Sequence, residues 1–356
     1  MNWFGVDCVD PIMELLREVL LVADRAFQGS LYTGKFMRPS YLINIGSEVY
    51  SSENGREIIS VFVDRNMGLP TDRCEALLVR SEDYVFEKGD VMKVSLGYDD
   101  KLKQVFSGLV ENIRYEVNTI RVSALGVAAE LLRLRINRIF LNQTAGKIVS
   151  DLSKEAKVKV KSASKGIRFP TYVIDDATNV YEHILKLAER CNFDVFVTED
   201  EQLVFKEWGD GKNHVLQYGQ EIIRLLAVDY SPLYTSTNVF GESPSSVKGS
   251  DTYHWLTKQE VKGEAGSGRV FLISDPAIRD KKTAETVAKA KMEKLRYTFS
   301  LFVEVVGNPQ IKLGDTITLE NIPNSSLKGQ LEVRGFEHYV SKDKGFTSKF
   351  SCLKRL

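Results

Sequence analysis

One six-residue pattern occurs twice in this sequence, at residues 89–94 (GDVMKV) and again at residues 314–319 (GDTITL). In both places a Gly-Asp pair, which is typical of turns, precedes apolar residues at alternate positions, which is typical of a strand. A later glycine, Gly108 in the first case and Gly329 in the second, precedes a further strand. The matching order of strands predicts two related β-barrels in one chain. A trimer of such a chain would present six near-equivalent barrels, so a threefold object could meet a sixfold ring.

The residues around the first copy of the pattern form short strand-like segments separated by polar turns. These segments lie at residues 41–45, 58–63, 75–79, 91–96, 105–110 and 120–124, with turn residues at 97–100. No helical periodicity interrupts them, which is typical of an antiparallel sandwich or barrel. We therefore expect a first β-barrel over residues 37–136.

Residues 137–218 have a different pattern, which predicts a small α/β insert. Two helices are expected, at 144–157 and 179–191. The second begins with a capping box formed by Asn179 and Glu182. A hairpin follows, with strands at 194–197 and 202–205.

Strand-like segments return after the insert and predict a second barrel over residues 219–356. They lie at residues 222–229, 237–240, 298–306, 315–319, 329–333 and 347–353. A Ser-, Pro- and Gly-rich loop at 243–250 and a connecting helix at about 276–296 interrupt them. The expected fold class is therefore mainly β, with two antiparallel β-barrels flanking a small α/β domain.

The N-terminal residues 1–36 are expected to form a helical arm. Residues 12–27 have an apolar face, Asp10 is suited to cap the helix and Pro11 to its first position. The charges along this helix exclude a segment that crosses a bilayer core, so we expect no membrane insertion. The arm either packs on its own domain or docks on a neighbouring chain, and the sequence favours neither.

Composition and residue spacing exclude several kinds of site. The chain carries 48 Lys and Arg against 48 Asp and Glu, whereas proteins that mainly grip nucleic acid are usually strongly basic. Cysteine and histidine residues are scattered without the spacing of a structural zinc site. The glycine-rich residues 263–268 precede no helix that could hold a phosphate and predict a flexible loop. We therefore expect no cofactor and no metal site.

Three groups of acidic residues could act as a catalytic pair in a cell-wall hydrolase, because glycoside hydrolysis needs two positioned carboxyl groups. They are Asp99-Asp100, Asp175-Asp176 and Glu199-Asp200-Glu201. All three lie at expected turns or helix starts, where acidic residues are common for structural reasons. We therefore predict no catalytic residues and no enzyme, and keep the hydrolase as the alternative.

Two further surface features are weighed in the same way. A basic run extends from Lys147 to Arg168, but aromatic partners that could stack on bases are scarce nearby, which favours a solvated surface. A receptor- or carbohydrate-binding β protein is a third reading, and its aromatic candidates are Trp208, Tyr253 and Trp255.

The sequence resembles one known family over about residues 38–356. Residues 88–99 and 105–110 resemble the first barrel of phage late control protein D, a family that includes contractile-tail baseplate hubs and the hub part of type VI secretion spike proteins. Residues 180–191 and 194–196 are similar to the family's insert. Residues 307–309, 313–315, 338–341 and 345–350 are similar to its closing barrel.

The resemblance implies a structural role in a phage or phage-like contractile injection system. It implies a homotrimeric baseplate hub in the virion, assembled in the bacterial cytoplasm, that joins the inner tail tube to a central spike. Because the secretion spike proteins continue after this barrel whereas this sequence ends at Leu356, a separate spike protein is expected. Other baseplate proteins are expected partners, one of which could receive the N-terminal arm. The bore of the ring would pass DNA or a tape protein.

Overall fold

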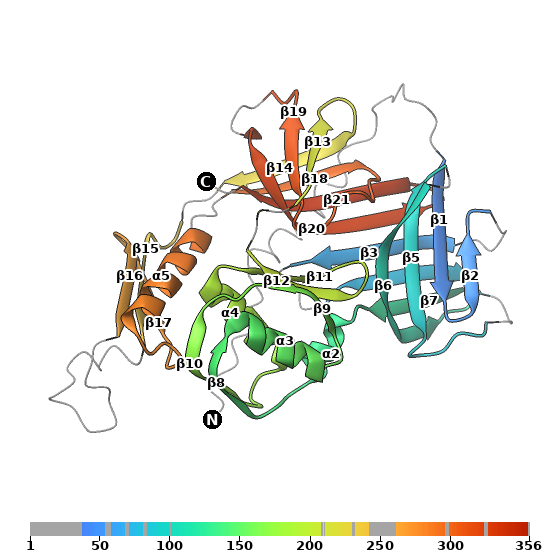
Figure 1. Cartoon of the computed structure of the whole chain (residues 1–356). Helices are drawn as coiled ribbons and strands as arrows, with labels where there is room; N and C mark the ends of the chain where they lie inside the picture. The colour runs from blue at the N-terminus through green and yellow to red at the C-terminus, as the bar shows by residue number, and fades with distance from the viewer. Residues whose placement is uncertain are drawn as a thin grey trace. The chain divides into compact units, whose positions relative to one another are not determined.

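The computed structural model describes residues 38–53, 58–67, 71–80, 84–99, 101–207, 209, 211–229, 232–241, 261–295, 299–323 and 327–354. The expected N-terminal arm and the loop at 243–250 lie outside these residues. The described chain is mainly β, as expected from the sequence, and one 13-stranded sheet dominates it (Figure 1).

The first group of strands forms an antiparallel ladder in the order β2-β1-β5-β6-β7-β4-β3. Its members, in chain order, are β1 (Pro39–Ile45), β2 (Glu48–Ser51), β3 (Ile58–Asn66), β4 (Arg73–Val79), β5 (Val91–Tyr98), β6 (Lys101–Tyr115) and β7 (Thr119–Leu125). All six of the segments expected from alternation are strands, and β2 is an additional one. Buried and exposed residues alternate along these strands because successive side chains point to opposite faces.

The second group of strands has the order β13-β19-β20-β21-β18-β14, which matches β1-β5-β6-β7-β4-β3, except that β13 lies parallel to β19 whereas β1 lies antiparallel to β5. Its members are β13 (Asn213–Gln217), β14 (Ile222–Asp229), β18 (Phe299–Val306), β19 (Thr316–Glu320), β20 (Gln330–Ser341) and β21 (Gly345–Lys354). Strand β20 also pairs with β3, so both groups belong to one continuous sheet. Closure of either group into a barrel stays a prediction.

Equivalent turns open the two copies of the repeated pattern. In the first group the Gly89 amide donates to the Val110 carbonyl over 2.8 Å, and the Val110 amide donates to the carbonyl of the aspartate after Gly89 over 2.9 Å. In the second group Gly314 and Val333 make the same two bonds over 3.0 and 2.8 Å. Both glycines have positive φ, +91° and +82°, a conformation that glycine adopts without strain. The repeat seen in the sequence is therefore a repeat of structure.

The register of the two copies corrects one detail of the sequence prediction. Met92 lies opposite Gly108 in β6, and its counterpart Ile317 lies opposite Leu331 in β20. Gly108 therefore corresponds to Leu331 and not to Gly329, and it lies inside β6 (Lys101–Tyr115) instead of preceding a strand, whereas Gly329 directly precedes β20. The turns are equivalent, but the connections between β5 and β6 and between β19 and β20 differ in length, so counting glycines gave the wrong offset.

The insert between the two groups contains short helices and two small sheets. Its elements are α2 (Ala128–Arg133), β8 (Arg138–Thr144), α3 (Ala145–Glu155), β9 (Lys159–Ala163), β10 (Arg168–Ile174), α4 (Val180–Cys191), β11 (Asp194–Val197) and β12 (Gln202–Lys206). Both expected helices and the hairpin β11–β12 are confirmed. The Asn179 side chain accepts from the Glu182 amide over 2.9 Å, which confirms Asn179 as the N-cap, and it also donates to the Glu182 carboxylate over 3.0 Å.

The insert has a hydrophobic core separate from that of the large sheet, and α3 and α4 bury their apolar faces in it. Strand β13, which falls inside the expected insert range 137–218, pairs in parallel with β19 of the large sheet. The domain boundaries stay predictions.

A third small sheet packs against the connecting helix. It consists of β15 (Ser236–Phe240), β16 (Lys262–Gly266) and β17 (Val270–Ser274), and α5 (Lys281–Leu295) covers it. The expectation of a flexible loop at 263–268 is wrong, because β16 occupies most of it. Gly263 lies so close to α5 that a Cβ there would be 2.2 Å from the Ala284 carbonyl carbon. This glycine allows the close approach of helix and strand.

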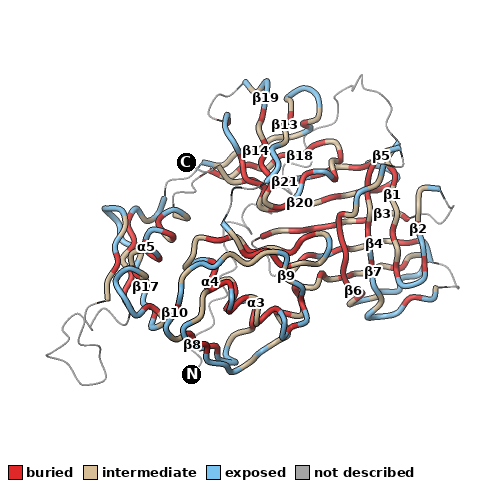
Figure 2. Tube along the Cα trace, in the orientation of Figure 1, coloured by how far each residue is buried: buried red, intermediate tan, exposed pale blue. Residues whose placement is uncertain are grey.

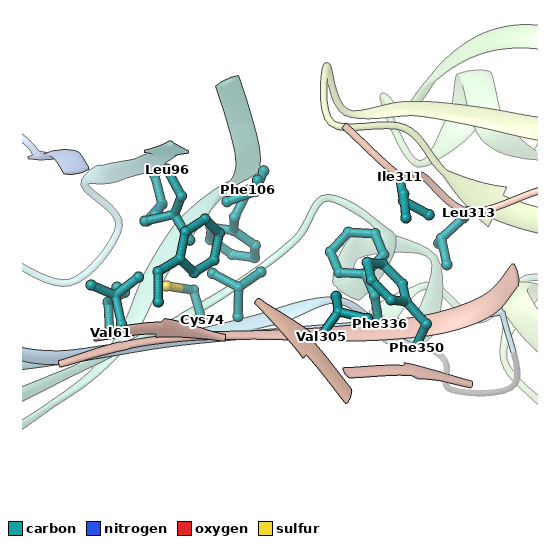
Figure 3. Packing of buried hydrophobic residues seen from close by; sticks show 14 of the residues in the cluster. Val61, Cys74, Leu96, Phe106, Val305, Ile311, Leu313, Phe336 and Phe350 are labelled. Carbon is teal, nitrogen blue, oxygen red and sulfur yellow. The ribbon is translucent and has the colours of Figure 1, made fainter. Parts of the chain in front are cut away.

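The large sheet carries a continuous core that runs across both strand groups (Figure 2). Figure 3 shows its side chains in two neighbouring clusters. Val61, Cys74, Leu96 and Phe106 mark the first cluster, and Val305, Ile311, Leu313, Phe336 and Phe350 mark the second. The pairing of β3 with β20 lies where these two parts of the core meet.

Candidate functional site

The most unusual buried group lies where the two strand groups and the insert meet. Arg65 follows Val61 and Val63 at the next inward position of β3, and it is only 2% exposed. Its Nε donates to the Asp72 carboxylate over 2.8 Å, and its Nη2 donates to the Val197 carbonyl of the insert over 2.5 Å. Its guanidinium lies 5.6 Å from the centre of the Phe336 ring in the second strand group. One side chain thus contacts three parts of the chain.

The insert contributes a second acid to this junction. Glu199, in the turn between β11 and β12, lies 3.3 Å from Arg65 Nη1 and 3.0 Å from Lys312 Nζ, which precedes β19. Its carbonyl accepts from the Gln104 side chain of β6 over 2.7 Å. Burial raises the pKa of Asp72, and the neighbouring Arg65 opposes that rise. The buried charges therefore depend on one another, which fixes the position of the insert hairpin on the sheet.

A second ionic cluster lies at the bulge of β20. Arg334 contacts Asp194 at the start of β11 and lies 3.1 Å from the Glu332 carboxylate. Burial raises the pKa of Glu332 to about 7, and the charge of Arg334 opposes this rise. Like Arg65, Arg334 connects the insert to the large sheet.

These contacts are those of a structural junction, because each buried charge has opposite charges or hydrogen-bond acceptors beside it. Glu199 is one of the candidate acids of a hydrolase. Its carboxylate pairs with two cations, Arg65 and Lys312, which favours a structural role. Of the other candidates, Asp99 accepts the Arg38 amide in a turn, and Asp175 accepts the Ala177 amide beside the start of α4. Asp100, Trp208, Tyr253 and Trp255 lie outside the described residues.

The remaining sequence candidates can also be located. The basic residues between Lys147 and Arg168 are exposed, and Lys147 pairs with Asp151 over 2.7 Å on α3. Within the described ranges, His, Cys, Asp and Glu side chains form no group of three that could hold a metal ion. A search of the same residues finds no helix long and apolar enough to span a membrane.

Arg65 is not among the residues that the sequence pattern singles out, because it lies beyond the expected strand segment 58–63 and arginine is rarely buried unless it is paired. Alternation along β3 was the available signal. If Val61 and Val63 face the core, the residue two positions further must also face it. An arginine there requires buried acceptors, which Asp72 and Glu199 supply.

Comparison with known proteins identifies the fold. The 43 kDa tail protein of prophage MuSo2 from Shewanella oneidensis matches with a TM-score of 0.69 and 14% identity, over 89% of this chain and 98% of that chain. A tail protein from Neisseria meningitidis MC58 matches with a TM-score of 0.67 and 11% identity, over 89% and 96%. A type VI secretion system component from E. coli, described as similar in structure to T4 bacteriophage tail proteins gp27 and gp5, matches with a TM-score of 0.54 and 12% identity, over 83% and 73%.

Sequence comparison adds little to these matches. No curated protein matches the chain. A family model described as the Alg8 N-terminal domain matches residues 71–241, just under half of the chain. That range begins after β3 and ends after β15, so it separates strands that pair within one sheet. The structural matches cover 83–89% of the chain, and they show that its fold is similar to that of these tail proteins.

Proposed function

We propose that this chain is a structural hub subunit of a phage or phage-like contractile tail. Three copies form a ring on the tail axis that joins the inner tail tube to a central spike. The observation that carries the proposal is the duplication of strand order, turn geometry and register within a fold shared with tail proteins. Two similar strand groups in each of three copies supply six similar units, which suits contact with a sixfold tube.

The ionic junction supports a mechanical role for the chain. Arg65 and Arg334 connect the insert to the sheet through hydrogen bonds and ion pairs, which hold the insert hairpin against both strand groups. Such contacts suit a hub, which would transmit force between tube and spike. No catalytic residue, metal or cofactor is part of this proposal. Of the acids of the hydrolase alternative, Asp99 and Asp175 accept backbone amides, and Glu199 is held in ion pairs.

The proposal also includes the partners and the location of the chain. Tube, spike and other baseplate proteins are its partners, the virion tail is its location, and DNA or a tape protein passes through the bore. Obligate interfaces of this kind bury on the order of 2,000 Å² or more. The chain should therefore be found in particles rather than as a free monomer.

Electron microscopy of particles that carry a tagged form of this chain tests the location. We expect tag density on the tail axis, between the end of the tube and the spike. Density along the whole tube, on peripheral fibres, or absent from purified particles would contradict the proposal. A zymogram with cell wall as substrate tests the alternative, a tail-associated cell-wall hydrolase. Clearing by the parent chain that disappears in a folded variant with Glu199, Asp200 and Glu201 changed to amides would favour that alternative.

A further inference from the structure

The joint between the two strand groups is made by a single strand pair. Residues Gly335 to Ser341 of β20 lie antiparallel to Asn66 to Ser60 of β3, with His338 opposite Val63 and Val340 opposite Val61. Because the two groups share one strand order, this joint shows how one strand group pairs with another. The strands that correspond to β3 and β20 in the other group are therefore expected to be able to pair in the same way.

The strands that correspond to the joint are identified by their pairing. Strand β6 corresponds to β20, because both have a register shift at the same place, after Val110 and after Val333. Strand β14 corresponds to β3, because both shift register against the neighbouring strand directly after the first pair of the ladder, after Ile222 and after Ile58. Matching these ladders makes Tyr115 the counterpart of His338.

The same matching makes Ala227 the counterpart of Val63, since Ala227 lies opposite Leu301 in β18 and Val63 opposite Cys74 in β4. Within the described residues, β14 is the terminal strand of the sheet, and β5 pairs with β6 only as far as Leu109. The two edges that correspond to the internal joint thus lack a strand partner in this part of the chain.

The side chains on these edges suit burial. Residues 225–228 of β14 are all apolar (LLAV) and half-buried, although a solvent-facing edge strand usually carries charges that prevent pairing. Near the end of β6, Tyr115 is 63% exposed, and Val117 in the following turn is 83% exposed. Such residues on open edges mark an interaction surface.

We propose that β14 of one copy pairs antiparallel with the end of β6 of a second copy of this chain, in the register of the internal joint. Tyr115 then lies opposite Ala227, and Ile113 lies opposite Asp229. Val117 lies beside Leu225. The proposal rests on the proposed function, because it supplies the contact by which copies of the hub join.

This contact is heterologous, since β14 and β6 are different surfaces, so each copy offers one edge to each of two neighbours. If every pair of neighbouring groups in a ring is joined as β3 and β20 are, first and second strand groups alternate around the ring. Three copies of the chain then supply six groups. The β6 hairpin turns after Tyr115, whereas β20 continues to Ser341, so the ladder between copies is shorter than the one inside the chain. The subunits are therefore held together less strongly than the two groups of one chain.

Disulfide trapping tests the register directly. The full-length chain carries Tyr115→Cys together with Ala227→Cys, a pair placed directly opposite each other by the proposal. The control carries Arg114→Cys with Ala227→Cys, because a one-residue shift moves the side chain to the other face of the sheet. Tyr115 is exposed in the single chain, and Ala227 is small, so both variants are expected to fold.

We expect oxidation to crosslink chains of the first variant into dimers and trimers, which reductant separates again. The control should crosslink no more than the parent chain does. The inference is overturned if the parent chain is oligomeric by mass yet the first variant does not crosslink, or if both variants crosslink equally. A monomeric parent chain in the presence of tube and spike proteins would overturn both the inference and the proposed function. Crosslinking in register into assemblies that are not threefold would support the inference and contradict the hub.

A second variant gives a readout that does not depend on cysteine chemistry. Tyr115→Lys places a charge on the proposed contact but changes only an exposed side chain in the single chain. We expect a shift to smaller assemblies with an unchanged unfolding midpoint of the single chain. An unchanged assembly mass would contradict the proposed contact.

Discussion

Replacing Arg65 with methionine tests whether the buried junction holds the three parts of the chain together. Methionine fills a similar volume but provides no charge and no donor. The substitution leaves the Asp72 carboxylate, which is 8% exposed, without its cation and leaves Glu199 with Lys312 alone. It also removes the hydrogen bond to the Val197 carbonyl.

The expected loss is set by the charge that stays buried. Removing one partner of a buried ion pair destabilises a protein by about 3–5 kcal/mol, because the other charge loses its compensation. Burial already raises the pKa of Asp72 and Arg65 opposes that rise, so the variant should raise the pKa further. A raised carboxyl pKa gives stability that is present below the unfolded value and lost as pH rises through the folded value. The deficit of the variant should therefore be smallest in acid and grow with pH.

Urea unfolding followed by fluorescence at several pH values measures this loss. Arg138→Met is a matched control, because Arg138 pairs with Glu155 over 3.1 Å and both side chains are largely exposed, at 47% and 40%. An exposed pair contributes at most about 1 kcal/mol. An Arg65→Met variant that loses no more free energy of unfolding than the control, at every pH, would refute the structural role of the junction.

Three further predictions concern other buried groups. Burial lowers the pKa of His338 to about 3, so wild-type stability should fall as pH drops from 6.5 towards 3, and His338→Phe should lack that fall in acid-unfolding curves. Burial raises the pKa of Glu332 from 4.5 to about 7, so stability from this group is lost as pH rises between these values. The free energy of unfolding of Glu332→Gln, measured by urea titration, should therefore rise relative to that of wild type as pH increases across that range. Gly263→Val should lower the unfolding free energy by about 1–3 kcal/mol through a clash with α5, whereas Glu264→Ala on the exposed face of the same strand should change it little; equal effects would contradict the close helix–strand contact.

Local signals predicted most elements of the large sheet and the insert helices. Alternation identified the strands, since their inner faces are apolar and their outer faces polar, and the Asn179 cap located the start of α4. The expected connecting helix begins later than Pro276, at Lys281, because Asp280 accepts from the Thr283 amide and caps it. The start of a helix is set by the hydrogen bonds of its N-cap. The sequence predicts that start well only where a single residue is clearly suited to cap it.

Elements that depend on distant partners were missed. Strands β8 and β10 pair only with each other and expose both apolar and polar residues, so their alternation is weak. Strand β16 contains two glycines, which favour a loop in the sequence because nothing local signals that Gly263 faces a helix. Arg65 was missed for the same reason, since its acceptors lie in other parts of the chain.

The mass of the native assembly tests the central claim most directly. The purified full-length chain is mixed with the tube and spike proteins of its particle and measured by native mass spectrometry. The account predicts an assembly that contains three copies of the 40.2 kDa chain. A persistent monomer, or an assembly whose copy number is not a multiple of three, would contradict it.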